Sequence, residues 1–231
     1  GSNLRKELSR QLRNTAEKDG TRRFSTLRGN VNLYRLFLER GMQLVRDEGR
    51  VRMIVPDSLL REKSSIPLRK LMIESNQWTT SWSFPENQRV FPGVTQGVLV
   101  LSITTGGSTQ TMKSFGPLEA TEISTQSGLK TKAPFMELTR PSWTVWTRGT
   151  WAVPRMPRDP YERRRVIRAI EDLANKPRLS EDSNWLNPSG KPIRVRVGEI
   201  DQTNWSDDIS EWALGARGVP FIRGTHFRTK G

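Results

Sequence analysis

Apolar and polar positions between residues 30 and 114 follow a pattern that predicts helices alternating with strands. Helices are expected at residues 33–46 and 66–75, where apolar side chains recur at the spacing of three and four residues that defines one helix face. Strands are expected at residues 51–55, 78–84 and 97–103, with a fourth candidate at 109–113. This order is typical of an α/β domain and argues against a helical bundle or a β-sandwich.

The two predicted helices have different expected start signals. Asn32 suits the N-cap of the helix at 33–46, because its side chain can accept a hydrogen bond from a free backbone N–H. Pro67 suits the first turn of the helix at 66–75. The side chains expected on the buried faces are Leu33, Leu36, Phe37, Leu44 and Val45 in the first helix, and Leu68, Leu71 and Met72 in the second.

The apolar run from Val51 to Val55 is typical of a central strand in a sheet covered on both faces. Asp57 follows at the end of this strand, where open α/β sheets bind ligands, but capping of the next segment is its favoured role. After the strand at 97–103, Gly106-Gly107 favours a hairpin turn over a phosphate-binding loop.

The pattern is weaker on both sides of this region. Leucines at every fourth position predict an amphipathic helix at residues 4–18, and a polar, basic loop follows it. Residues 159–175 are predicted to form a helix that begins at Asp159-Pro160, and residues 193–197 alternate like a half-buried strand. The expected buried stripe of the helix at 159–175 is Tyr161, Val166, Ile167, Ile170 and Leu173.

The chain is therefore expected to have three parts. These are a basic N-terminal helix and loop at residues 1–29, an α/β part at 30–114, and a mixed α+β part at 115–231. The segment 115–158 is rich in proline and places Trp143, Trp146 and Trp151 among arginines. Aromatic and cationic side chains in this arrangement can bind single strands, but packing of the indoles against the sheet is the favoured interpretation.

Composition changes this picture mainly through charge. The chain has 38 Lys+Arg against 24 Asp+Glu, a formal net charge of +14, which indicates a polyanionic partner, with nucleic acid ahead of an anionic membrane. Absence of cysteine excludes a thiolate metal site, and a single histidine argues against a zinc site or a Ser-His-Asp triad. No apolar run reaches the roughly 20 residues of a membrane span, so a cytoplasmic location is expected.

Basic side chains form three clusters that are candidates for DNA contact. Arginine suits this role because its planar guanidinium binds phosphate in a bidentate manner. Each cluster could equally be a solvated surface. The candidates are Arg22, Arg23 and Arg28 in the N-terminal loop, Arg163, Arg164, Arg165 and Arg168 on the expected polar arc of the helix at 159–175, and Arg223, His226 and Arg228 near the end of the chain.

Several catalytic motifs are absent. The chain contains no phosphate-binding Gly-x-x-x-x-Gly-Lys-Ser/Thr, no Gly-x-Gly-x-x-Gly and no Gly-x-Ser-x-Gly. Arg158-Asp159-Pro160-Tyr161 superficially resembles the Asp-Pro-Pro-Tyr loop of adenine methylases. It lacks the second proline, and the helix start explains Asp159 and Pro160 without any catalytic role.

A series of short motifs stands in a fixed order between Asn32 and Ile103. They are Asn32-Leu33-Tyr34, Val51 to Ser58 with its Val-Pro-Asp-Ser ending, Leu68-Arg69, and Val90-Phe91-Pro92-Gly93-Val94 leading into Gly97 to Leu101. In this order they resemble the second half of the catalytic domain of adenine-N6 DNA methyltransferases, in particular those of type IIG restriction-modification and phage-exclusion systems. Residues 198–204 and 218–224 are similar to the segment that leads into the target-recognition domain of that family.

The resemblance implies a partial Rossmann-like methyltransferase sheet with flanking helices, followed by the beginning of a target-recognition domain. It implies that the full enzyme acts on double-stranded DNA, flips a target adenine out of the duplex, and methylates its N6 from S-adenosylmethionine. The Gly-rich donor loop and the Asn-Pro-Pro-Tyr motif are absent from this sequence. The chain is accordingly expected to be a fragment, inactive alone, whose missing N-terminal part lies on the same polypeptide or on a partner subunit. The alternative is a non-catalytic basic nucleic-acid-binding module with a methylase-like sheet.

The resemblance also assigns a candidate base-stacking residue. Phe91 matches the aromatic that the family places before the hairpin strand to stack on the flipped base, and Val90, Pro92 and Val94 would shape the same loop. The alternative is that Phe91 only fills the end of the sheet.

Overall fold

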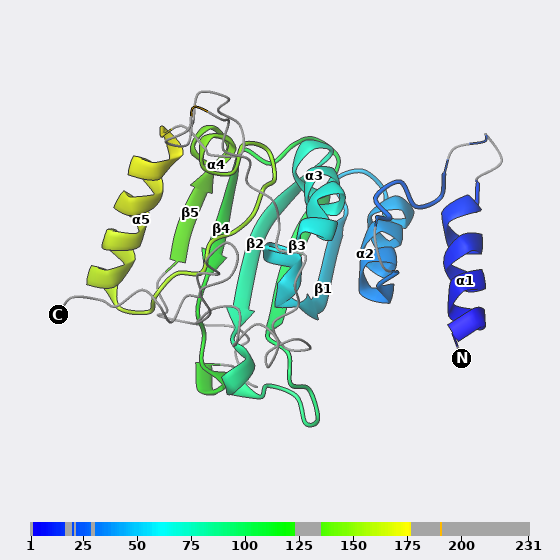
Figure 1. The fold of residues 1–231 in the computed structure, drawn as a ribbon, viewed down its shortest axis with the longest axis horizontal. Helices are drawn as coiled ribbons and strands as arrows, with labels where there is room; N and C mark the ends of the chain where they lie inside the picture. Colours follow the sequence, from blue (N-terminus) through cyan, green and yellow to red (C-terminus); the bar gives the residue numbers. More distant parts are fainter. Residues whose placement is uncertain are drawn as a thin grey trace. The chain divides into compact units, whose positions relative to one another are not determined.

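The computed structural model describes residues 2–16, 20, 22–28, 31–122, 135–176 and 190 (Figure 1). The chain divides into two units, residues 1–176 and 177–231, and the described helices and strands all belong to the first. Within the described residues, no helix is long and apolar enough to cross a membrane. The predicted strand at 193–197 and the candidates Arg223, His226 and Arg228 lie outside the described residues.

The first unit alternates helices and strands, as the sequence pattern predicts. The helices are α1 (Ser2–Asn14), α2 (Leu33–Leu44), α3 (Ile66–Glu74), α4 (Arg140–Thr147) and α5 (Pro160–Ala174). The strands are β1 (Arg50–Pro56), β2 (Asn76–Phe84), β3 (Val98–Thr105), β4 (Thr111–Phe115) and β5 (Phe135–Thr139). Short 3-10 helices are η1 (Asp57–Leu60), η2 (Lys63–Ser65), η3 (Glu86–Gln88) and η4 (Ala120–Glu122).

The strands form one mixed five-stranded sheet in the order β1-β3-β2-β4-β5 (Figure 1). β3 pairs antiparallel with both β1 and β2, β2 pairs parallel with β4, and β4 pairs antiparallel with β5. The predicted α/β class is confirmed. The predicted hairpin at Gly106-Gly107 is wrong, because β3 and β4 do not pair with each other. After β3 the chain crosses β2, and β4 pairs with the other edge of β2.

β1 lies at the edge of the sheet, so its prediction as a central strand is wrong. Val51 and Val55 are buried, whereas Arg52 and Ile54 are exposed on the opposite face. This alternation is typical of a strand covered on one face only. The sequence does not show this alternation, because Ile54 is apolar although its side chain is exposed.

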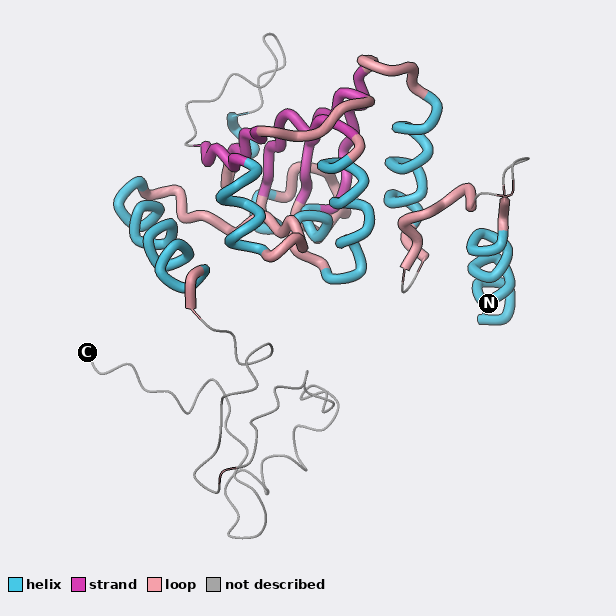
Figure 2. The backbone as a smooth tube through the Cα atoms, turned by 90° about the horizontal axis from the view of Figure 1, so that it is seen from above, coloured by secondary structure: helices cyan, strands magenta, loops and turns pink. Residues whose placement is uncertain are grey.

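One face of the sheet carries the main core. α3 and α4 pack on this face, and Figure 2 shows both on the same side of the strands, while Leu38 and Met42 of α2 join the same core. Leu68 and Met72 of α3 are buried there as predicted, and Leu71 is half-buried. The largest buried side chains of this core include Trp78 and Trp143, whose ring centroids are 6.0 Å apart.

α2 buries a face that overlaps only in part with the one predicted, since Leu36 is buried and Val45 packs against the core as expected. Leu33, Phe37 and Leu44 are exposed, and the buried side chains are Arg35, Leu36, Leu38, Glu39 and Met42. The helix is turned this way because Glu39 and Arg35 have tertiary partners that the local pattern does not show. Asn32 stands at the N-cap position, but its side chain makes no capping hydrogen bond.

α5 begins as predicted and packs differently. The backbone N–H of Glu162 donates to Asp159 Oδ1 at 2.8 Å, which confirms Asp159 as the N-cap. Val166, Ile167 and Ile170 pack against the core, while Tyr161 and Leu173 of the predicted stripe are exposed.

The proline-rich segment contains more structure than its sequence indicates. β5 and α4 were not predicted, and Trp143 and Trp151 are buried in the core, which confirms packing as their role. We expected one part of the chain to end at residue 114 and the next to begin at residue 115. Both residues lie inside β4, and β5 continues the sheet beyond them.

Candidate functional site

The loop between β2 and β3, residues 85–97, presents Phe91 at one end of the sheet. A turn in which the Val94 N–H donates to the Phe91 carbonyl at 3.2 Å forms its tip, and Gly93 adopts a φ of +73° that favours glycine. Phe91 is 39% exposed, whereas Val90 packs against Phe84 and Val98. Val90 therefore fills the end of the sheet, and the Phe91 ring stays accessible.

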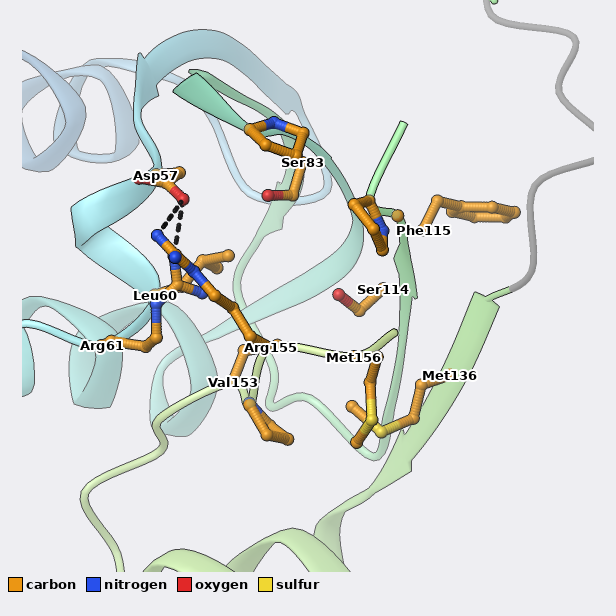
Figure 3. A pocket seen from close by; sticks show the side chains of 14 residues that line it. Asp57, Leu60, Arg61, Ser83, Ser114, Phe115, Met136, Val153, Arg155 and Met156 are labelled. Carbon is orange, nitrogen blue, oxygen red and sulfur yellow. Dashed lines mark hydrogen bonds and ion pairs between the residues drawn. The ribbon is translucent and has the colours of Figure 1, made fainter. Parts of the chain in front are cut away.

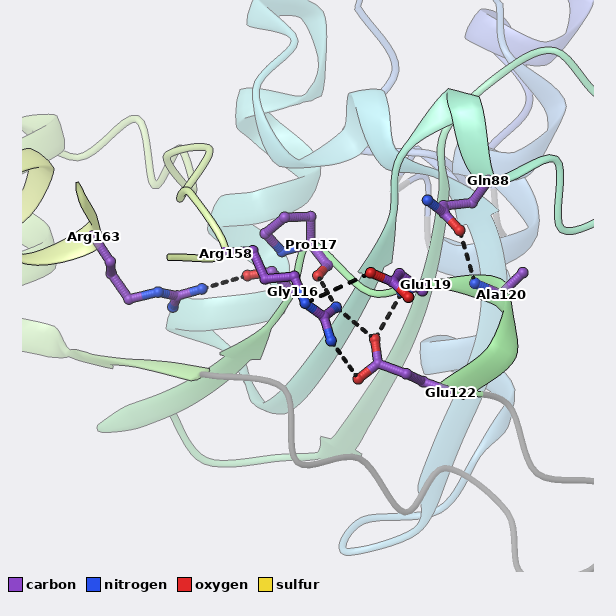
Figure 4. A network of polar contacts seen from close by, with 8 residues as sticks. All are labelled: Gln88, Gly116, Pro117, Glu119, Ala120, Glu122, Arg158 and Arg163. Carbon is purple, nitrogen blue, oxygen red and sulfur yellow. Dashed lines mark hydrogen bonds and ion pairs between the residues drawn. The ribbon is translucent and has the colours of Figure 1, made fainter. Parts of the chain in front are cut away.

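Hydrogen bonds and ion pairs hold the base of this loop (Figure 4). The backbone N–H of Ala120 donates to Gln88 Oε1 at 2.9 Å, which ties the loop to the segment that follows β4. Arg158 binds both oxygens of Glu122 at 2.7 and 3.1 Å, and the hydrogen bonds to Glu122 raise the pKa of Arg158. Phe91 thus lies on a loop with fixed ends.

A cavity of about 200 Å³ opens at the same end of the sheet (Figure 3). It is bounded by the ends of β1, β2 and β4 and by residues 153–156. Phe91 is not among its lining residues. Its polar lining includes Asp57, Arg61, Ser83, Ser114 and Arg155, and its apolar lining includes Phe115, Met136 and Met156.

Asp57 is the acidic group of this cavity. Its carboxylate binds Arg61 Nη2 at 2.5 Å and lies 3.7 Å from Arg155 Nη2, as the dashed lines in Figure 3 mark. Its backbone N–H donates to the Gly97 carbonyl at 2.9 Å. The carboxylate makes no capping hydrogen bond at η1, so the prediction that Asp57 caps the next segment is wrong.

Two features of the cavity follow from the close packing around Asp57. A Cβ on Gly97 would lie 2.7 Å from Asp57 Cγ, so only glycine leaves room for the carboxylate. Burial lowers the pKa of Arg61 because it disfavours the charged guanidinium, and the positive charge of Arg155 acts in the same direction.

The N-terminal basic loop is anchored by a buried carboxylate. Glu39 of α2 accepts hydrogen bonds from the backbone N–H and the hydroxyl of both Ser25 and Thr26, at 2.6–3.3 Å. Arg22 and Arg28 are exposed on either side of this anchor, and Arg23 is half-buried.

The arginines of α5 do not share one environment. Arg164 and Arg168 are exposed, and Arg165 binds Glu162 at 3.0 Å. Arg163 is buried and donates to the carbonyls of Gly116 at 2.6 Å and Pro157 at 3.2 Å, the first of which is drawn in Figure 4. Its placement on the polar arc is therefore wrong, and burial lowers its pKa.

Two arginines near this end of the sheet, Arg89 and Arg61, were not singled out from the sequence, and Arg155 was noted only as one of the arginines that stand among the tryptophans of residues 143–151. Arg89 is exposed, lies two residues before Phe91 and adopts a left-handed backbone with φ +42°. Its closeness to the Phe91 motif was a usable signal. Arg61 and Arg155 lie 94 positions apart in the sequence and meet only at Asp57, so no local pattern could pair them. Within the described residues, no group of three metal-ligating side chains occurs.

The comparison with protein families adds a match that includes this loop. Residues 5–91 match the Eco57I restriction-modification methylase family. Over these residues the chain is similar to restriction-modification methylases. The resemblance stated from the sequence motifs is confirmed for this methylase-related segment, which contains α2, β1, α3, β2 and the loop as far as Phe91.

Solved structures show weaker likeness to this methylase-related chain. The type IIG restriction endonuclease BpuSI is 19% identical, with 55% of this chain and 16% of that chain covered and a TM-score of 0.41. The M protein of the type I restriction enzyme EcoKI is 13% identical, with 69% and 46% covered and a TM-score of 0.42. The chain thus spans less than half of either structure. Among curated proteins, none matches the chain.

Proposed function

We propose that this chain is part of an adenine-N6 DNA methyltransferase of a restriction-modification system. The full enzyme would bind double-stranded DNA, flip the target adenine, and transfer a methyl group to it from S-adenosylmethionine. The observation that carries the proposal is the accessible Phe91 ring at the end of a segment that matches the methylase family.

Phe91 stacks on the flipped adenine in this proposal. A base inside a duplex cannot expose its amino group to an enzyme, so it must leave the helix and be held by stacking and hydrogen bonds. Stacking of a base on one aromatic side chain contributes roughly 1–3 kcal/mol. Val90 anchors the loop, while the exposed Pro92 and Val94 shape its tip around the base.

The proposal requires a partner that supplies the donor loop and the Asn-Pro-Pro-Tyr motif. Two described surfaces support such a partner. β1 is an edge strand of seven residues with no further described strand paired to it, and natural proteins usually cover such edges. Leu33, Phe37 and Leu44 project from α2 into solvent, with Phe37 65% exposed. The missing part of the methylase would cover both, and the chain alone would be inactive.

DNA contacts in the proposal come from exposed arginines. Arg22 and Arg28 form one exposed group on the anchored loop, next to the half-buried candidate Arg23, and Arg164 and Arg168 form another exposed group on α5. Arg223 and Arg228 remain candidates outside the described residues. Arg163 is left out, because its guanidinium is buried and already binds two carbonyls.

Two matched substitutions test the role of Phe91. The probes are two labelled duplexes of identical sequence that differ only in whether one adenine is paired or faces an abasic site. Phe91→Ala is expected to weaken binding to the unpaired adenine roughly 5- to 150-fold, the equivalent of one lost stack, and to affect the paired duplex less. Phe37→Ala removes another exposed ring, on α2, and should change neither affinity.

The comparison between the duplexes decides the outcome. A stacking role requires that the loss depend on the unpaired adenine. Equal loss on both duplexes, or no loss on either, would remove Phe91 from the base pocket. The alternative of a non-catalytic nucleic-acid-binding module would then be favoured.

A further inference from the structure

The second face of the sheet, opposite α3 and α4, carries a hollow that the methylase proposal does not use. It has a volume of about 560 Å³, within the range of roughly 300–1,000 Å³ found for small-ligand sites. The register places Arg52 opposite Ser102, Ser102 opposite Thr80, and Val100 opposite Trp82. The side chains that project into this hollow from β1, β3 and β2 are therefore neighbours on one face.

The polar groups of the hollow are available to a ligand. Arg50 and Arg52 are exposed, and neither has an acidic partner within the described part of the chain. The hydroxyls of Thr80, Ser102 and Thr104 also line the hollow or its rim and make no hydrogen bond to described residues. The hollow thus combines two cations and three hydroxyls that have no partner among the described residues.

Trp82 forms one wall of the hollow and begins a row of aromatic side chains. Its ring stacks on Phe115, with centroids 5.7 Å apart and an angle of 11° between the planes. Phe115 in turn contacts Phe135 at 5.2 Å, and the Lys113 Nζ lies 5.4 Å from the Phe135 centroid. Phe135 is 47% exposed at the end of the row.

We propose that this face binds single-stranded nucleic acid, with one nucleotide in the hollow. The base stacks on Trp82, the hydroxyls of Thr80, Ser102 and Thr104 bind its edge, and Arg50 and Arg52 bind the adjacent phosphate. The strand then follows the aromatic row toward Phe135, with Lys113 at a second phosphate. This function is separate from methylation and does not depend on the role of Phe91.

Charge and chemistry favour nucleic acid over a protein partner on this face. Cations beside aromatic rings are the combination with which proteins bind unpaired bases without sequence preference. Glu137 on β5 is an acidic side chain of the same face. It lies opposite Lys113 in the pairing of β4 with β5, and not beside the hollow. A peptide without acidic side chains would leave Arg50 and Arg52 without anionic acceptors.

The test measures binding of the full chain to a labelled single-stranded DNA of about 12 nucleotides by fluorescence anisotropy over a range of salt concentrations. The double variant Arg50→Gln/Arg52→Gln is expected to weaken binding and to reduce the slope of log affinity against log salt by roughly 0.7 for each lost phosphate contact. Trp82→Leu is expected to weaken binding roughly 5- to 150-fold with an unchanged slope.

A matched control removes the same charge elsewhere. Lys63→Gln/Lys70→Gln changes two exposed lysines of η2 and α3, which lie on the other side of the sheet, and should leave affinity and slope as in the wild type. Equal losses in the two double variants would show general charge attraction and overturn the proposal. Absence of single-strand binding by the wild type would overturn it as well. Thermal melting of each variant shows whether Trp82→Leu remains folded, and the arginine variant decides the question if it does not.

Discussion

Glu39 is the residue whose replacement tests most directly how the N-terminal basic loop is held. Its carboxylate is fully buried and accepts hydrogen bonds from two backbone N–H groups and two hydroxyls of Ser25 and Thr26. Glu39→Gln keeps the shape of the side chain, removes the charge, and turns one acceptor oxygen into a donor. In either orientation the amide nitrogen would face a backbone N–H. At the Oε1 position this is the N–H of Ser25, which would lose its acceptor on residue 39; at the Oε2 position it is the N–H of Thr26, which would keep only its 3.3 Å bond to Oε1.

The expected cost follows from these contacts. Hydrogen bonds to a charged group contribute about 1.5–3 kcal/mol each, and a buried donor without a partner costs about 1–3 kcal/mol. The hydroxyls of Ser25 and Thr26 can rotate to accept from the new amide, which recovers part of this loss. We therefore expect Glu39→Gln to lower the free energy of unfolding by about 2–4 kcal/mol.

Urea unfolding measures this change, and trypsin sensitivity shows where it acts. Cleavage after Arg22, Arg23 and Arg28 should accelerate, because the loop loses its anchor to α2. Glu7→Gln is the control, since Glu7 makes an exposed pair with Arg10 on α1, and such pairs contribute well under about 1 kcal/mol. A Glu39→Gln variant as stable as wild type, with unchanged cleavage, would refute the anchoring argument.

Two further predictions concern packing inside the first unit. Gly97→Ala should destabilise the protein by roughly 1–3 kcal/mol, because the new Cβ would meet the Asp57 carboxylate at 2.7 Å, whereas Gly41→Ala, with Val51 at 3.4 Å, should be neutral or stabilising in urea unfolding. Arg69→Met should cost about 2–4 kcal/mol, because Arg69 donates to the carbonyls of Leu59, Glu62 and Thr150, of which Glu62 would keep only its bond from the Ser65 N–H. Wild-type stability of Arg69→Met in thermal melting would show that water replaces these donors.

Local signals predicted the elements between residues 33 and 103 and the start of α5. Helical spacing marked α2 and α3, and the apolar runs marked β1 and β3. Asp159 and Pro160 carry their own start signal, because an N-cap acts on the backbone within the same turn. The methylase resemblance also depended only on motif order along the chain, and the family match confirmed it for residues 5–91.

The same signals failed where partners are distant in sequence. The buried face of α2 depends on Glu39 meeting Ser25 and Thr26, and Arg35 meeting Glu62. Helical spacing places Arg163 on the polar face of α5, but its side chain is buried and donates to the Gly116 carbonyl. A strand was expected at residues 109–113, and β4 spans Thr111–Phe115. β5 was not predicted, because it is short and only its pairing with β4 makes it a strand.

The sequence by itself determined the α/β class, the positions of most helices and strands, the net positive charge and the methylase relationship, because these properties depend on residue type and local spacing. Only the tertiary structure decided that β1 is an edge strand, that Val90 fills the sheet end while Phe91 stays accessible, and that Asp57 meets Arg61 and Arg155. It also decided that Trp82 borders a hollow with Arg50 and Arg52. The physical reason is that burial and pairing are set by contacts between segments far apart in the chain, and a local pattern carries no record of those contacts.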